Sequence, residues 1–261
     1  MNTGKYRFKL AMFWLFIWAL FLPVTVQAQT VKPKIELPNN VESLKLNSKL
    51  MAREMPYRVI LPVSYKTSNE KTFYPVIYLL HGLTGHFDNW ADKTKLTDYS
   101  ANYNYIIVMP EGNNGWYTDS GSVPNDRYES YIIKELIPEI DKNFRTVADK
   151  NHRAVAGLSM GGYGAIKFGL KYAEMFSLVG SFSGALGAGT LTEKEVGTKG
   201  VIATSILSVY GIANSKTRQE NDIFQMIKEI SPDKIKSLPF IYLDCGTEDF
   251  LYQNNRDFAN L

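Results

Sequence analysis

Cysteine is almost absent from this chain, since Cys245 is the only one among 261 residues. A single cysteine can form neither an intrachain disulfide nor a cysteine-based metal cluster. Histidine is also scarce, with three in the chain, and none has a carboxylate or cysteine partner at metal-ligand spacing. The sequence therefore predicts no metal ion and no organic cofactor.

The first residues have the pattern of an export signal rather than of a folded element. Residues 1–28 combine a basic start, an unbroken apolar run over residues 10–22 and a small-residue cleavage pattern that ends at Ala28. The alternative is an uncleaved membrane anchor, but the run is shorter than the about 20 residues that cross a bilayer. We therefore expect signal cleavage, no stable membrane insertion afterwards, and a periplasmic or secreted protein.

The mature chain lacks an excess of either charge. Removing residues 1–28 takes away three basic and no acidic residues, so Lys and Arg fall from 29 to 26 and equal the 26 Asp and Glu. A near-neutral domain gives no support for binding of nucleic acid.

The remaining composition, 45% hydrophobic and 13% aromatic, suits one globular domain with a sizeable core. Residues 29–43 contain two prolines and few large apolar side chains, so they are interpreted as a linker. The domain itself is expected over residues 44–261.

Hydrophobic patterns within this domain predict an α/β fold. Residues 44–50 and 56–61 alternate as an antiparallel edge pair would, whereas 75–80 and 105–109 are continuous apolar runs typical of buried parallel strands. Helices are expected within residues 88–103, 126–140 and 162–172, and further strands at residues 176–182 and 238–245. Alternating strands and helices indicate a mainly parallel sheet with helices on both faces.

The most informative motif is Gly157-Leu158-Ser159-Met160-Gly161, which lies between an apolar run and a stretch compatible with a helix. In this context the pattern predicts a nucleophile elbow, a sharp turn that holds the serine hydroxyl clear of the sheet. Side chains at the two glycines would collide across such a turn. The alternative is a serine that only caps the helix.

Two further segments fit the chemistry of an activated serine. His81-Gly82-Leu83 closes an apolar strand where a loop can supply one oxyanion donor, the Leu83 amide; the second donor would be the amide of Met160. The acids Asp244, Glu248 and Asp249 leave a later strand, and position favours Asp249 as the carboxylate that orients a base.

Trp116 and Tyr117 follow a strand end and a glycine, where loops line the mouth of open α/β sheets. They form one wall of a substrate pocket or pack their loop onto the core, and the sequence does not decide between these roles. His81 is placed at the same pocket, with its imidazole orienting the oxyanion loop.

Five segments together resemble the putative-esterase family of α/β-hydrolases, which includes tributyrin esterases, S-formylglutathione hydrolases and feruloyl esterase domains. These segments are His81-Gly82-Leu83, Gly115-Trp116-Tyr117-Thr118-Asp119, Gly157-Leu158-Ser159-Met160-Gly161-Gly162-Tyr163-Gly164, Ser181-Phe182-Ser183-Gly184-Ala185-Leu186 and Asp244-Cys245-Gly246-Thr247-Glu248-Asp249-Phe250-Leu251. The resemblance implies a serine esterase that acts through an acyl-enzyme on short-chain or carbohydrate-linked esters. It also implies Ser159 as nucleophile, Asp249 as triad acid, and Leu83 with Met160 as the oxyanion hole.

The departure from the family pattern is the base. The order serine, acid, histidine predicts a histidine after Asp249, and none follows Ser159 in the sequence. We therefore expect the last strand and helix of the fold, with this histidine, to be missing, and the activity of this chain to be low. His81, His86 and His152 are weak substitutes; the last precedes the elbow strand at its opposite end. The alternatives are an acyltransferase of the same fold and an inactive remnant that only binds.

Overall fold

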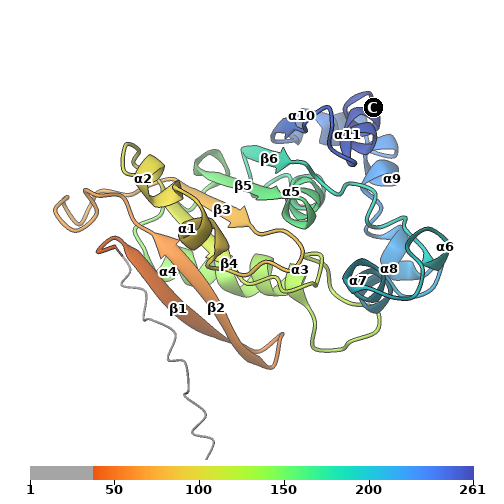
Figure 1. Ribbon diagram of the computed structural model, residues 1–261. Helices are drawn as coiled ribbons and strands as arrows, with labels where there is room; N and C mark the ends of the chain where they lie inside the picture. The colour runs from red at the N-terminus through yellow and green to blue at the C-terminus, as the bar shows by residue number, and fades with distance from the viewer. Residues whose placement is uncertain (1–37) are drawn as a thin grey trace, which may run out of the picture. The chain divides into compact units, whose positions relative to one another are not determined.

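The computed structural model describes residues 38–261, so the predicted signal peptide and most of the predicted linker lie outside the described residues (Figure 1). A seven-stranded sheet forms the centre, with the strand order β1-β2-β4-β3-β5-β6-β7. The strands are β1 (Val41–Ser48), β2 (Arg53–Ile60), β3 (Val76–Leu80), β4 (Ile106–Pro110), β5 (Arg153–Leu158), β6 (Leu178–Phe182) and β7 (Phe240–Asp244).

The predicted antiparallel pair is present at one edge of the sheet. β1 pairs with β2 along its whole length, and β2 pairs antiparallel with β4. β1 begins at Val41, which is buried against the sheet, so the linker expected over residues 29–43 extends at most to Asn40. The other five strands run parallel, which puts their carboxyl ends on one edge.

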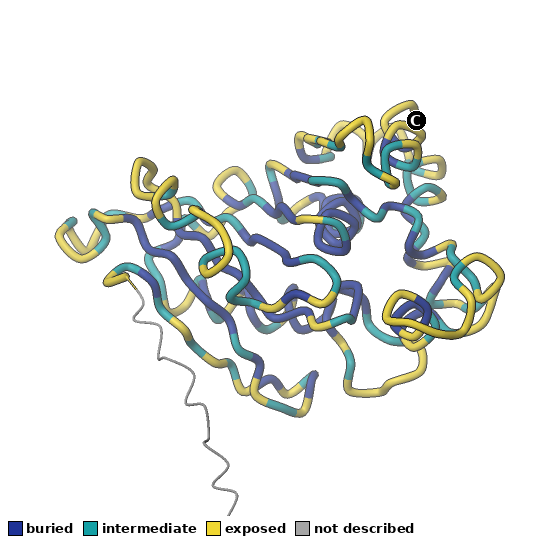
Figure 2. Tube along the Cα trace, in the orientation of Figure 1, coloured by how far each residue is buried: buried dark blue, intermediate teal, exposed yellow. Residues whose placement is uncertain are grey.

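Helices cover both faces of the sheet, as predicted. One face packs against α3 (Tyr128–Tyr131), η2 (Ile132–Leu136), α4 (Ile137–Asn143) and α5 (Met160–Lys171), and the other against α1 (Asn89–Lys93) and α2 (Leu96–Ser100). Figure 2 shows α5 buried along its length. A helix buried on all sides fits the apolar sequence that follows Ser159.

Two predicted helices differ in detail. The single helix expected within residues 88–103 is wrong, because Thr94 has an extended backbone and its hydroxyl bonds to the Trp90 carbonyl and the Leu96 amide. The helix over residues 128–143 contains the π-helical turn η2, which ends at Leu136, two residues before Pro138. Proline has no amide hydrogen for the regular ladder, which accounts for a local change of helical pitch there.

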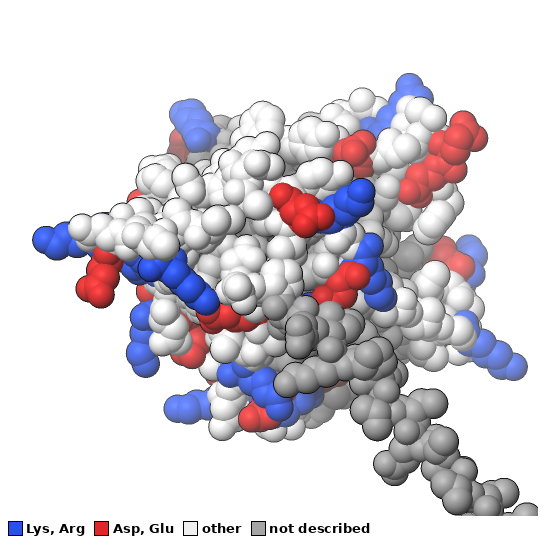
Figure 3. Space-filling model, turned by 60° about the vertical axis from the view of Figure 1, so that its left-hand side comes forward, with Lys and Arg blue, Asp and Glu red and all other residues white. Residues whose placement is uncertain are grey.

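Short helices alternate with loops on both sides of β7. They are α6 (Glu193–Val196), α7 (Val201–Tyr210), α8 (Lys216–Gln219), α9 (Ile223–Lys228), α10 (Pro232–Ser237) and α11 (Tyr252–Ala259). Among the helices of residues 38–261, none is both long enough and apolar enough to cross a membrane. Basic and acidic side chains are interspersed on the face drawn in Figure 3.

Candidate active site

Ser159 lies in a strained turn between β5 and α5. Its backbone has φ 56° and ψ −112°, a left-handed conformation that is uncommon for a residue with a side chain. The turn is fixed from both sides, because the Ser159 amide donates to the Phe182 carbonyl (2.9 Å) and its carbonyl accepts from Tyr163 and Ala185 (3.0 Å each). Strain of this kind persists only where the surroundings determine it and is often found at functional sites.

The side chain of Ser159 is not used to hold the helix. It is half-buried, and it does not cap α5, although the residue occupies the N-cap position. The hydroxyl is therefore next to the amino end of α5, where amide groups favour a developing negative charge. This arrangement speaks against the purely capping role that the sequence left open.

The loop after β3 lies directly against the elbow. A Cβ atom built on Gly82 would be 3.6 Å from the Cβ atom of Ser159 and 3.4 Å from the Leu158 carbonyl oxygen. No backbone hydrogen bond within residues 38–261 uses the amide of Leu83 or of Met160. Both predicted oxyanion donors are thus on segments that meet at Ser159, with amides that are not bonded elsewhere in the described chain.

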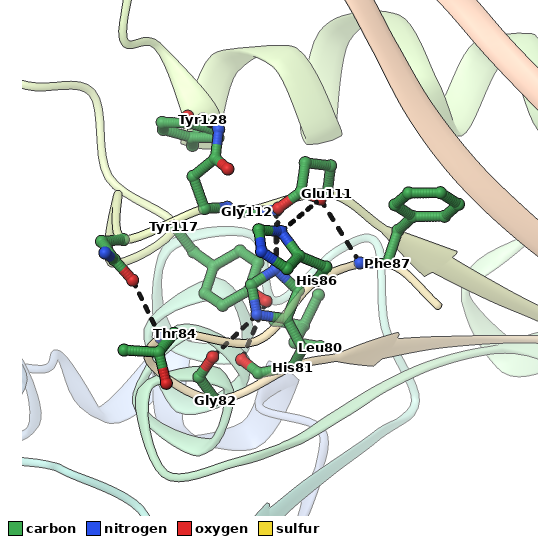
Figure 4. Close-up of polar contacts among 12 residues, drawn as sticks. Leu80, His81, Gly82, Thr84, His86, Phe87, Glu111, Gly112, Tyr117 and Tyr128 are labelled. Atoms are coloured by element: carbon green, nitrogen blue, oxygen red, sulfur yellow. Dashed lines mark hydrogen bonds and ion pairs between the residues drawn. The ribbon is translucent and has the colours of Figure 1, made fainter. Parts of the chain in front are cut away.

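The Glu111 carboxylate contacts residues at both ends of this loop (Figure 4). One of its oxygens is 3.2 Å from His81 Nε2 and 2.6 Å from the Asn113 amide nitrogen, and the other is 3.2 Å from His86 Nδ1. Glu111 as a whole is only 5% exposed. Burial raises its pKa, but the hydrogen bonds from His81 and Asn113 and the charges of the histidines bring the pKa below its ordinary value.

His81 is buried behind the oxyanion loop. Its Nδ1 lies 2.8 Å from the Gly82 carbonyl oxygen, which can only accept, and the Gly112 amide lies 2.9 Å from Nε2. The Gly82 contact requires a proton on Nδ1, and Nε2 faces both the Gly112 amide, which donates, and a Glu111 oxygen, which accepts. The ring therefore holds the loop by its backbone, and its predicted contact with substrate stays a prediction.

Trp116 and Tyr117 are also buried, with 3% and 0% exposure. The indole of Trp116 donates to the Ser205 hydroxyl (3.0 Å), and the Tyr117 hydroxyl donates to the His81 carbonyl (3.0 Å). Both have left-handed backbones, with φ of 51° and 50°. These contacts favour the loop-packing role over the pocket wall, and a part in substrate binding stays a prediction.

A buried lysine under this turn holds it in place. Lys167 of α5 is fully buried, and its ammonium donates to the Tyr117 carbonyl (2.7 Å) and the Thr118 hydroxyl (2.6 Å). It also pairs with Glu129 at 2.9 Å. Burial lowers the pKa of Lys167 to about 8, against the opposing effect of Glu129.

The candidate acid lies beside the strand next to the elbow strand. Ser183, which directly follows β6, donates its amide to the Asp244 carbonyl (2.7 Å). Asp249 accepts from the Leu251 amide (2.8 Å), and this bond, followed by one from the Ser183 hydroxyl, lowers the pKa of Asp249. Asp249 is half-buried, whereas Asp244 and Glu248 are exposed.

The histidines that the chain contains are engaged elsewhere. His86 has a mostly exposed ring bonded to Glu111, and His152 bonds to Asp149 (2.9 Å) at the start of β5, the end opposite Ser159. No group of three or more His, Cys, Asp or Glu side chains in residues 38–261 is arranged to hold a metal ion.

Sequence reasoning missed Glu111, Lys167 and Ser183. The available signal for Glu111 was a charged residue directly after the apolar strand β4, where parallel-sheet sites gather. Ser183 was part of a quoted motif but had no assigned role. Lys167 gave no signal, since a lysine inside a helix is usually solvated.

Comparisons with known proteins identify the family of this chain. The family model described as putative esterase matches residues 48–261. The chain is 28% identical over 232 residues to an acetyl esterase of Caldicellulosiruptor saccharolyticus. This alignment covers 84% of this chain and 85% of that protein. A stretch of 130 residues is 43% identical to an esterase of Mycobacterium tuberculosis and spans 48% of this chain but 28% of that protein.

Solved structures give the same result. A ferulic acid esterase superposes with a TM-score of 0.69 at 30% identity, covering 84% of this chain and 83% of that chain. An S-formylglutathione hydrolase of Staphylococcus aureus shares the fold, with a TM-score of 0.69 at 24% identity and 84% coverage of both chains. The chain therefore belongs to the putative esterase family of α/β-hydrolases and is a carboxylic ester hydrolase.

Proposed function

We propose that Ser159 attacks the carbonyl carbon of a small ester and forms an acyl-enzyme. The serine hydroxyl loses its proton to a base as the new C–O bond forms, and the base returns that proton to the departing alcohol. Water then attacks the acyl-serine and releases the acid. The observation that carries this proposal is the left-handed backbone of Ser159, which presents a hydroxyl that does not cap the helix.

Leu83 and Met160 would stabilise the tetrahedral intermediate through their amides. Charge develops on the carbonyl oxygen only during the reaction, so donors placed there act mainly on kcat. Each such donor is typically worth about 3 kcal/mol. The contact of Gly82 with Ser159 supports this role, because it brings the Leu83 loop to the nucleophile.

Asp249 would orient the base and stabilise its imidazolium. The family order predicts a histidine after this residue, and the 261 residues contain none there. Imidazole added to the assay can act in its place, since a small base can enter a half-exposed site.

The substrate class we propose is short acyl esters, including acetyl or feruloyl groups on carbohydrate. The support is the similarity to an acetyl esterase over most of both chains and to a ferulic acid esterase structure at 30% identity. The acyl groups in these two names, acetyl and feruloyl, differ in size.

The test is the hydrolysis of p-nitrophenyl acetate by wild type and Ser159→Ala over a series of imidazole concentrations. Imidazole hydrolyses this ester slowly in solution, and the variant measures that background. We expect the difference between the two proteins to rise with imidazole and to saturate. If folded wild type shows no excess over Ser159→Ala at any concentration, the nucleophile assignment is wrong. A Ser159-dependent rate without imidazole would mean that a histidine in the chain serves as base.

We further propose export, with cleavage after Ala28, supported by the basic start and apolar run of residues 1–28. Expression of the full chain in a bacterial host with a periplasm tests this directly. The expected result is a periplasmic product whose measured mass corresponds to a start at Gln29. A product that retains residues 1–28 would contradict it.

A further inference from the structure

Glu111 is a buried carboxylate that the esterase reaction as described does not use. It directly follows β4 and accepts from the Asn113 amide (2.6 Å). It also reaches His81 Nε2 (3.2 Å), His86 Nδ1 (3.2 Å) and the Phe87 amide (3.4 Å). Two oxygens of one side chain thus contact both the strand-to-loop junction after β4 and the neighbouring loop after β3.

The partners on the loop after β3 lie at its two ends. His81 is the first residue after the strand, and His86 and Phe87 precede α1. Leu83, the proposed oxyanion donor, lies between them. A loop joined at both ends to one buried group loses most of its freedom, and fixing each residue otherwise costs roughly 1–2 kcal/mol of entropy.

Other contacts hold the same loop but only at single points. The Thr84 amide donates to the Asn114 side chain (2.8 Å), the Tyr117 hydroxyl donates to the His81 carbonyl (3.0 Å), and the Gly85 amide donates to the Gly82 carbonyl (2.9 Å). Among the described residues, Glu111 is the side chain that joins the start of the loop to its end (Figure 4).

We propose that Glu111 is a positioning residue that fixes the Leu83 amide in the oxyanion hole by closing the loop between His81 and Phe87. It does not touch the substrate, and its effect passes through the backbone of the loop. This inference rests on the proposed function, because the Leu83 amide matters for catalysis only if Ser159 is the nucleophile.

The test compares Glu111→Gln with a matched control, Glu135→Gln. Glu135 is also a carboxylate that accepts from two backbone amides, those of Lys49 (3.0 Å) and Leu50 (3.2 Å), but it holds the β1–β2 hairpin away from the elbow. Glutamine keeps the shape of glutamate and replaces one accepting oxygen by a donor. In Glu111 each oxygen faces a backbone amide, so the new donor must oppose one of them. In Glu135 both amides contact one oxygen and the Ser48 hydroxyl contacts the other, so the control reports the loss of the charge alone.

Two quantities are measured for each variant. The first is hydrogen exchange of the Thr84 and Gly85 amides, which do not bond to Glu111 and so report the loop rather than the deleted contact. We expect exchange there to rise about tenfold in Glu111→Gln and to stay unchanged in Glu135→Gln. The second is the Ser159-dependent rate in saturating imidazole. We expect kcat to fall roughly 10- to 100-fold in Glu111→Gln with KM nearly constant, because a misplaced oxyanion donor acts in the transition state.

Each outcome is decisive. Unchanged loop exchange overturns the proposal, as does faster exchange with an unchanged kcat, or an equal fall of kcat in both variants. If wild type shows no Ser159-dependent rate while Glu111→Gln still loosens the loop, the proposed function fails but the fixing of the loop by Glu111 stands. Should Glu111→Gln not fold, His86→Ala removes one partner at a mostly exposed position, and the same exchange and kcat changes are expected at smaller size.

Discussion

Gly161 faces the backbone of Leu80 so closely that a Cβ atom on it would lie 2.4 Å from the Leu80 carbonyl oxygen. Both groups are backbone, in β3 and at the start of α5, so no side-chain rotation can relieve the clash. The elbow therefore requires glycine at position 161, because any side chain there would collide with the backbone of β3.

The first prediction concerns this contact. Gly161→Ala should lower the free energy of unfolding by about 3 kcal/mol or more, because the strand or the helix must shift. Gly246→Ala is the control, since a Cβ atom there meets nothing within 4 Å. Urea unfolding of both variants measures the difference, and equal stabilities would show that the turn can relax.

Acid stability should depend on Glu129. Burial raises its pKa, but the combined effect of Lys167 and Lys171 is larger and brings the pKa from 4.5 down to about 2. The folded carboxyl thus binds a proton less readily than the unfolded one, so its stabilisation is full above pH 4.5 and is lost as the pH falls through about 2. The loss amounts to roughly 3 kcal/mol at most.

Unfolding of Glu129→Gln tests this ion pair. At pH 7 the variant leaves the buried Lys167 ammonium without its charged partner, at a cost of roughly 3–5 kcal/mol. The double variant Glu129→Gln with Lys167→Met removes the unpaired charge as well and should recover part of this loss. Glu54→Gln, which breaks an exposed pair with Lys45, should change stability by less than about 1 kcal/mol. If all three variants unfold alike, the buried pair contributes no more than the surface pair.

Trp116→Phe separates the two roles that the sequence left open for this residue. The structure predicts a loss of roughly 1–3 kcal/mol, because the indole bond to Ser205 disappears from a buried position. The ratio of rates on p-nitrophenyl acetate and butyrate should stay constant. A changed ratio at unchanged stability would assign Trp116 to the substrate pocket instead.

Asp249→Asn should lower the Ser159-dependent rate in imidazole, because the carboxylate no longer orients the added base. Glu248→Gln is the matched control in the same loop, with an exposed side chain. We expect about a tenfold loss or more for Asp249→Asn and no change for the control. A greater loss in Glu248→Gln would assign the triad acid to Glu248.

The parts of the fold that depend on local pattern could be predicted from the sequence. Apolar runs identified the parallel strands, and the spacing of Gly157 and Gly161 around Ser159 predicted the elbow, because both follow from sterics within a few residues. Strand bounds differed by a few residues, as at Val41, where burial continues past the alternating pattern.

The parts that depend on distant partners could not be predicted. Burial of Tyr117 follows from its bond to His81, 36 residues away, and from the Lys167 ammonium, 50 residues away. The role of Glu111 likewise needs partners 24 to 30 residues distant, which no local pattern reveals.

The most direct test of the account is the site at which a fluorophosphonate attaches to the folded chain in the presence of imidazole. We predict one adduct, mapped by mass spectrometry to the peptide that carries Ser159. It should be absent in Ser159→Ala and should not form on protein that was heat-denatured before the probe was added. An adduct on another residue, or none on folded wild type, would contradict the assignment of Ser159 as the nucleophile.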